Sequence, residues 1–196
     1  MTTVEAADLR SCLGRFATGV TVVSYAADGK PRGATVNAFS SVSLDPPLVL
    51  VSIARSAKAC PLLENSAFCV NVLAADQVDI AMNFAGKPTD RPVHWDHGDW
   101  APRLRESHAW LECKPWRAYD GGDHVLYLGE VQQLSIRASS EPLLFHAGSF
   151  LRRGDGLDRD GQRIGRAIGH PLPPAPAEDE DEIHRFAREG FAEGWL

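Results

Sequence analysis

The apolar residues of this chain fall in many short runs that are typical of β-strands. The runs cover residues 20–25, 33–38, 48–53, 68–73, 109–116, 124–134 and 143–150. Asp28-Gly29 and Asp45-Pro46-Pro47 are turn signals between three of them. Many strands separated by turns favour a barrel or a sandwich over a sheet that alternates with helices.

Helical periodicity is confined to short stretches. It predicts helices over residues 5–17, 57–65 and 77–84. In the first of these, Ala6, Leu9, Leu13 and Phe16 recur at helical spacing. Asp76 is a plausible N-cap for the third helix, and Gly86 is placed to end it. Residues 87–103 are rich in proline and aspartate and are predicted to form a long loop.

The composition changes beyond residue 153. Residues 154–169 are rich in glycine and arginine, residues 170–177 resemble a polyproline linker, and five acidic residues follow at 178–182. Apolar residues then recur at Ile183, Phe186, Phe191 and Trp195, as in a short amphipathic helix or a segment that becomes helical on docking. We therefore predict one domain over residues 1–153 and a C-terminal extension over 154–196.

Charge is distributed unevenly between these two parts. The formal net charge is −6, and residues 171–196 hold seven acidic and two basic residues, which leaves −1 for residues 1–170. A near-neutral body argues against nucleic acid or an anionic membrane as a partner, because both need a basic face. No apolar run approaches the ~20 residues of a membrane span, and no signal peptide is visible, so we expect a cytoplasmic protein. The four cysteines form no CxxC pair and are expected to be reduced, buried thiols.

One small, polar segment, Thr35–Ser41, lies between two apolar runs. Its backbone could approach a planar ligand closely and offer N–H groups to the heteroatoms of that ligand. Ser40, Ser41, Ser56 and Lys58 could receive a phosphate group. The alternative interpretation is a serine-rich turn that caps a helix.

Histidines supply two further candidates. His124 follows a Gly-Gly-Asp turn, where it could meet a ligand at a barrel rim or could simply be a hydrogen-bonded rim residue. His94 and His97 lie in a proline-rich loop without a third ligand cluster, so we expect no metal there. The chain has no GxGxxG or P-loop motif and no GxSxG nucleophile.

Seven short blocks in a fixed order carry a resemblance to a known family. They are F-A-T-G-V at 16–20, T-V-N-A-F-S-S-V-S-L-D-P-P-L at 35–48, S-A-K-A at 56–59, N-F-A-G at 83–86, L-E-C at 111–113, G-D-H at 122–124 and F-H-A-G-S-F at 145–150. Together they resemble the short-chain flavin reductases, from about Leu9 to about Arg153. The resemblance implies a mainly β fold with flanking helices, the FMN-binding split β-barrel, in a homodimer. It also implies NAD(P)H-dependent reduction of FMN or FAD, with the reduced flavin passing to a partner monooxygenase.

The resemblance assigns roles to fifteen residues. Thr35, Val36, Asn37 and Ala38 match the segment that contacts the isoalloxazine, and Ser40, Ser41, Ser52, Ala54, Ser56 and Lys58 match the ribityl and phosphate positions. Phe84 and Gly86 match a loop near the outer part of the flavin, His124 matches a nicotinamide-positioning histidine, and Phe150 and Arg152 match residues that close over the site. No protein acid or base is expected, because hydride passes between the cofactors.

Two alternatives stay open at this stage. The chain could bind or store flavin without reductase turnover, or it could hold flavin as a prosthetic group of another oxidoreductase. The sequence does not distinguish FMN from FAD. NADH is the default over NADPH, because no basic cluster awaits a 2′-phosphate.

Overall fold

The computed structural model describes residues 4–157 and 163–164. Its largest sheet has seven antiparallel strands in the order β3-β2-β6-β9-β10-β5-β4. Their bounds are β2 (Thr21–Ala27), β3 (Lys30–Val36), β4 (Phe39–Leu44), β5 (Pro47–Ala54), β6 (Phe68–Val72), β9 (Ala109–Gly121) and β10 (His124–Ile136). Most of these strands coincide with the apolar runs of the sequence. Of the predicted extension over 154–196, residues 158–162 and 165–196 lie outside the described residues.

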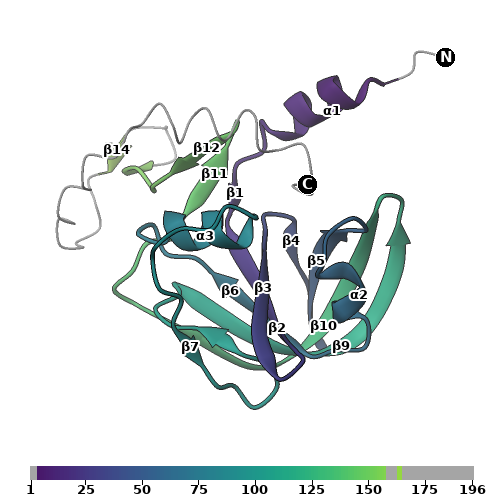
Figure 1. The fold of residues 1–196 in the computed structure, drawn as a ribbon. Helices are drawn as coiled ribbons and strands as arrows, with labels where there is room; N and C mark the ends of the chain where they lie inside the picture. Colours follow the sequence, from purple (N-terminus) through teal and green to yellow (C-terminus); the bar gives the residue numbers. More distant parts are fainter. Residues whose placement is uncertain (1–3, 158–162, 165–196) are drawn as a thin grey trace.

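This sheet curls into a barrel that is split on one side. Strands β3 and β4 follow each other in the chain yet form the two edges of the sheet (Figure 1). The inner faces of six strands share one core, which contains Val23, Tyr25, Val36, Val49, Val51, Ile53, Phe68, Val70, Cys113 and Tyr127. A single core enclosed by one curled sheet is the geometry of a barrel. The predicted fold class is confirmed.

A second core packs on the outside of β2. It holds Val20, Val22, Leu73, Ile80, Ala81, Leu104, Leu143 and Phe145. Helix α3 (Val78–Phe84) covers β2 and β3 there, next to a three-stranded sheet of β1 (Thr18–Gly19), β11 (Leu144–His146) and β12 (Ser149–Leu151). Strand β2 is therefore buried on both faces over residues 21–25, and this stretch includes the polar residues Thr21 and Ser24.

The remaining elements are short. Helix α2 (Cys60–Leu63) packs against β2, and β7 (Trp95–Asp96) pairs with β8 (Arg103–Leu104). β13 (Gly156–Leu157) pairs with β14 (Arg163–Ile164). The predicted loop 87–103 thus contains a short strand. None of the helices in the described part of the chain is long and apolar enough to cross a membrane.

Local turn signals were largely correct. Asp28 and Gly29 have φ values of 52° and 69° and join β2 to β3, as a two-residue hairpin requires. Gly86 follows α3 with φ 88°, so that helix ends where expected. Asp76 is not the N-cap of α3, because the helix starts one residue later and the cap position is Gln77. The Gln77 side chain instead accepts a hydrogen bond from Ala74 N at 2.9 Å.

Helix α1 (Ala6–Leu13) is shorter than predicted and has no buried residue. It projects from the barrel (Figure 1). Leu9, Leu13 and the following Phe16 are 46%, 43% and 77% exposed. Their helical spacing therefore marks an apolar face that the described part of the chain leaves uncovered.

The cysteines differ in their surroundings. Cys60, Cys69 and Cys113 are buried, as predicted, but Cys12 is exposed because α1 lies away from the body. Burial raises the pKa of the Cys113 thiol to about 12, with a further contribution from the nearby Glu112 carboxylate. The thiolate is the reactive form, so a raised pKa and burial both protect the thiol.

In the native protein, a thiol reagent should therefore label one cysteine per chain. With a coloured disulfide reagent at pH 8 we expect Cys12 to react and the three buried thiols to react only after denaturation. The Cys12→Ser variant should lose the native reaction and keep the three slow thiols. Rapid reaction of more than one thiol in the folded wild type would contradict this assignment.

Candidate functional site

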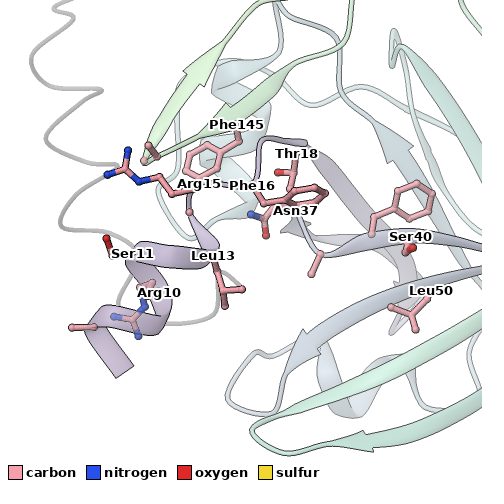
Figure 2. Close-up of a pocket in the computed structure, with 16 residues that line it drawn as sticks. Arg10, Ser11, Leu13, Arg15, Phe16, Thr18, Asn37, Ser40, Leu50 and Phe145 are labelled. Carbon is pink, nitrogen blue, oxygen red and sulfur yellow. The ribbon is translucent and has the colours of Figure 1, made fainter. Parts of the chain in front are cut away.

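A pocket of about 880 Å³ lies where the N-terminal segment, the β3–β4 link and the β11–β12 turn meet (Figure 2). It is lined by Ala7, Arg10, Ser11, Leu13, Gly14, Arg15, Phe16, Thr18, Asn37, Ala38, Phe39, Ser40, Leu50, Phe145, Ala147 and Gly148. Its volume lies within the range of ligand and cofactor sites. Asn37, Ala38 and Ser40 are the predicted flavin residues that it contains.

One wall of this pocket is formed by contacts between the N-terminal segment and the β11–β12 hairpin. Thr18 of β1 pairs with Phe145 of β11, and Ala147 N donates a hydrogen bond to Gly14 O at 2.9 Å. The tight turn at Ala147 and Gly148 has φ values of 48° and 83°. These contacts bring the F-A-T-G-V and F-H-A-G-S-F blocks together on one side of the cavity.

The lining is mainly apolar with few polar groups. Leu13, Phe16 and Leu50 face the cavity together with Asn37 (Figure 2). Phe145 also lines it, and Phe150 packs edge-on behind Phe145 with ring centroids 5.4 Å apart. Apolar walls with a few polar groups suit a planar aromatic ligand that carries heteroatoms at its edge. The lining therefore fits the isoalloxazine ring of a flavin.

The predicted isoalloxazine segment is held rigidly by its neighbours. Thr35 Oγ1 donates a hydrogen bond to Ala81 O at 2.6 Å, and Thr21 Oγ1 donates one to Val36 O at 2.7 Å. Thr35 and Val36 are themselves buried, so their side chains support the backbone and do not line the pocket. Ala38 O accepts a hydrogen bond from Ser52 N at 3.0 Å, which ties the β3–β4 link to β5.

Strand register places four predicted residues on one face of the sheet. Val51 and Ile53 point into the barrel core, so Leu50, Ser52 and Ala54 face outward. Ser40 of β4 pairs with Leu50 of β5, and His124 of β10 pairs with Ala54 of β5. Because cross-strand partners lie on the same side of a sheet, Ser40, Ser52, Ala54 and His124 share the outer face that begins at the pocket.

His124 itself is largely enclosed at the end of this face. Its side chain is 13% exposed, and its Nδ1 lies 2.7 Å from Asp123 Oδ1. This hydrogen bond and the imidazole charge hold the pKa of the Asp123 carboxyl below its usual value. His124 Nε2 is buried and has no hydrogen-bond partner among the described residues. His124 does not line the pocket, so its nicotinamide role stays a prediction.

Other predicted residues lie elsewhere. Ser41 is exposed on β4, in a strand rather than in the serine-rich turn that was the alternative. Ser56 and Lys58 are exposed in the turn after β5, and Gly86 and Arg152 are also exposed. Phe84 belongs to the second core, where it packs edge-on against Trp95 with centroids 5.6 Å apart. The flavin roles of these residues stay predictions.

The pocket also contains residues that were not predicted. Leu13, Phe16, Thr18, Leu50, Phe145, Ala147 and Gly148 are among them. A signal was present, because five of these residues belong to the two blocks at 16–20 and 145–150. Among the described residues, no group of three or more metal-ligating side chains could hold a metal ion.

Comparison with known proteins gives the family. The model of the family described as "Flavin reductase like domain" matches residues 13–153, well over half of the chain. The chain belongs to this flavin reductase family. The predicted recognition is confirmed.

Two curated relatives are similar in different ways. An "NADH-dependent flavin reductase" from Rhodococcus sp is 41% identical over 149 residues, covering 72% of this chain and 83% of the relative. The "Flavin-dependent monooxygenase, reductase subunit HsaB" of Mycobacterium tuberculosis (strain ATCC 25618 / H37Rv) is 34% identical over 199 residues, covering 98% of both chains. The second similarity therefore extends through the C-terminal extension.

Solved structures show the same fold. The native-state structure of "Flavin reductase PheA2" is 36% identical, with a TM-score of 0.74, and the match covers 78% of this chain and all of that chain. The structure of "BorF, the Flavin Reductase Component of a Bacterial Two-Component Tryptophan Halogenase" is 41% identical, with a TM-score of 0.69 and the same two coverages.

Proposed function

We propose that this protein uses NADH to reduce free FMN or FAD and supplies the reduced flavin to a partner monooxygenase. The observation that carries the proposal is the pocket at the β3–β4 link. It combines the isoalloxazine-type residues Asn37 and Ala38 with apolar walls. Relatives named as NADH-dependent flavin reductases and as a monooxygenase reductase subunit support the reductase over a storage protein.

The residues of the chain bind and orient, and the flavin supplies the hydride-accepting ring. The Asn37 amide and the backbone of Asn37 and Ala38 can donate hydrogen bonds to the edge of that ring. Leu13, Phe16 and Leu50 would supply apolar contacts to the ring. None of the described pocket residues needs to act as an acid or a base.

The proposal is tested by NADH oxidation at 340 nm with the purified protein. We expect oxidation only after FMN or FAD is added, and faster oxidation with NADH than with NADPH. Protein that purifies yellow and oxidises NADH without added flavin would indicate a prosthetic group. Flavin binding without any NADH consumption would indicate a storage protein.

The proposal includes a homodimer in the cytoplasm. The uncovered apolar face of α1 and the residues that follow it support self-association, because exposed apolar patches mark interaction surfaces. Light scattering of the full-length chain tests the dimer. A monomer at micromolar concentration would contradict it.

Substitution of His124 should weaken the binding of NADH and leave the binding of flavin unchanged. We expect His124→Ala to raise the KM for NADH roughly tenfold, while the Kd for flavin stays within about twofold of the wild-type value. Steady-state kinetics and flavin titration provide the two measurements. Wild-type KM and kcat in His124→Ala would exclude the positioning role.

The C-terminal extension should contribute to assembly or turnover. Its similarity to a monooxygenase reductase subunit and its apolar residues Phe186, Phe191 and Trp195 support docking on this protein. We expect deletion of residues 171–196 to weaken dimerisation or slow NADH oxidation. If both quantities keep their wild-type values, the extension docks neither on the partner subunit nor near the nicotinamide site.

A further inference from the structure

The turn that carries His124 is tied to the end of β5 by one side chain. Arg55, the first residue after β5, donates from Nε to Gly122 O at 2.8 Å and from Nη2 to Asp120 Oδ2 at 2.7 Å. Its backbone N donates to Asp123 O at 2.8 Å. Arg55 therefore contacts three of the four residues that precede His124.

Besides these bonds from Arg55, the turn has a hydrogen bond of its own, between Gly122 and Asp120. Gly122 has φ 78°, and its N–H donates to Asp120 Oδ1 at 2.9 Å. The Asp120 carboxylate thus bonds the turn with one oxygen and Arg55 with the other. Because Arg55 directly follows the last residue of β5, it fixes the β9–β10 turn relative to the strand that passes the pocket.

Stability alone does not account for this arrangement. The Arg55 and Asp120 side chains are 47% and 81% exposed, and such surface ion pairs add little to folding free energy. The same chain offers a matched pair in Arg105 and Asp96, at 2.8 Å with 56% and 46% exposure, beside the β7–β8 hairpin, which is a separate sheet from that of β9 and β10. The two pairs differ in their further contacts: the Arg55 side chain also bonds the backbone of the β9–β10 turn, whereas both bonding nitrogens of Arg105 contact Asp96.

We propose that Arg55 is a positioning residue for the nicotinamide nucleotide, which acts by holding the Asp120–Asp123 turn so that His124 keeps its place opposite Ala54. The inference rests on the proposed reductase function. Arg55 needs both its planar fork and its charge for this, because Nε and Nη2 contact different residues of the turn. Arg55 is not among the residues that line the pocket.

The test compares Arg55→Ala, Arg55→Lys and the control Arg105→Ala. We expect Arg55→Ala to raise the KM for NADH roughly fivefold, with kcat and the flavin Kd within about twofold of wild type. Arg55→Lys should recover part of the loss, since lysine can pair with Asp120 but cannot form both side-chain bonds. Arg105→Ala should leave all three quantities unchanged.

A second readout does not depend on turnover. NMR of the imidazole signals, with His124 assigned by its own substitution, should show the His124 resonances moving in Arg55→Ala and staying in place in Arg105→Ala. An unmoved His124 signal, or a wild-type KM in Arg55→Ala, would overturn the positioning role. If wild-type protein consumes no NADH, the proposed function fails, and the NMR comparison still decides whether Arg55 holds the turn.

Discussion

Replacing Ser40 by tryptophan should weaken flavin binding by about 100-fold, which corresponds to roughly 2.7 kcal/mol. Ser40 lines the pocket from the exposed side of edge strand β4 (Figure 2). An indole at that position would occupy space between Asn37 and Leu50 that the ring of the ligand needs. The fold should survive, because Ser40 is exposed and its hydroxyl donates a hydrogen bond to Ser41 O on the same strand.

Fluorescence quenching of FMN and FAD measures the loss, and NADH oxidation should fall in parallel at limiting flavin. Leu44→Trp is the matched control: Leu44 lies on the same strand, is 96% exposed and does not line the pocket. Equal flavin affinity in the two variants would mean that the ligand binds elsewhere.

Replacing Glu112 by alanine should lower the free energy of unfolding by about 3 kcal/mol. Glu112 is completely buried on β9, where Oε2 accepts a hydrogen bond from Trp100 N at 3.2 Å and Oε1 lies 3.2 Å from Arg103 Nε. Gly98 packs so closely over this carboxylate that any side chain at position 98 would overlap it. The carboxylate thus holds the segment between β7 and β8 against the barrel.

Removing it leaves the Arg103 charge and the Trp100 N–H without this partner and opens a cavity next to Cys69, the cross-strand neighbour of Glu112 on β6. Urea unfolding followed by circular dichroism measures the effect. Glu112→Gln should lose less stability, because the amide oxygen can still accept from Trp100 N. The exposed Asp96→Ala variant, which loses an ion pair on the same hairpin, should change stability by less than about 1 kcal/mol. A small effect of Glu112→Ala would show that the hairpin is held by other contacts.

The strands could be predicted largely from local pattern, because alternation and turn chemistry act within a few residues. Asp28-Gly29 needs positive φ at both positions, and that requirement is visible in the sequence itself. The same local logic failed for Ser40 and Ser41. Their small, polar side chains resembled a turn, but the ladder with β5 places them in an edge strand, where one face tolerates polar residues.

The site was predicted only in part, for a related reason. Asn37, Ala38 and Ser40 line the pocket as expected, whereas Phe84 is used in the second core and packs against Trp95. The order of the short blocks identified the family. It did not show which blocks meet, since contacts between residues far apart in the chain depend on strand pairing.

The sequence by itself determined that this chain forms many short strands with tight turns, belongs to the flavin reductases and carries an acidic extension. Strands and turns depend on neighbouring residues, the family is identified by the order of short blocks, and charge is a sum over residues, so none of these properties requires knowledge of which segments pair. Only the tertiary structure decided which residues form the cavity. Pairing of β1 with β11 joins Thr18 to Phe145, and the register of β5 with β10 places His124 opposite Ala54. Such pairings are selected by the burial of whole faces of a sheet, and a one-residue shift would turn each of these side chains to the opposite face.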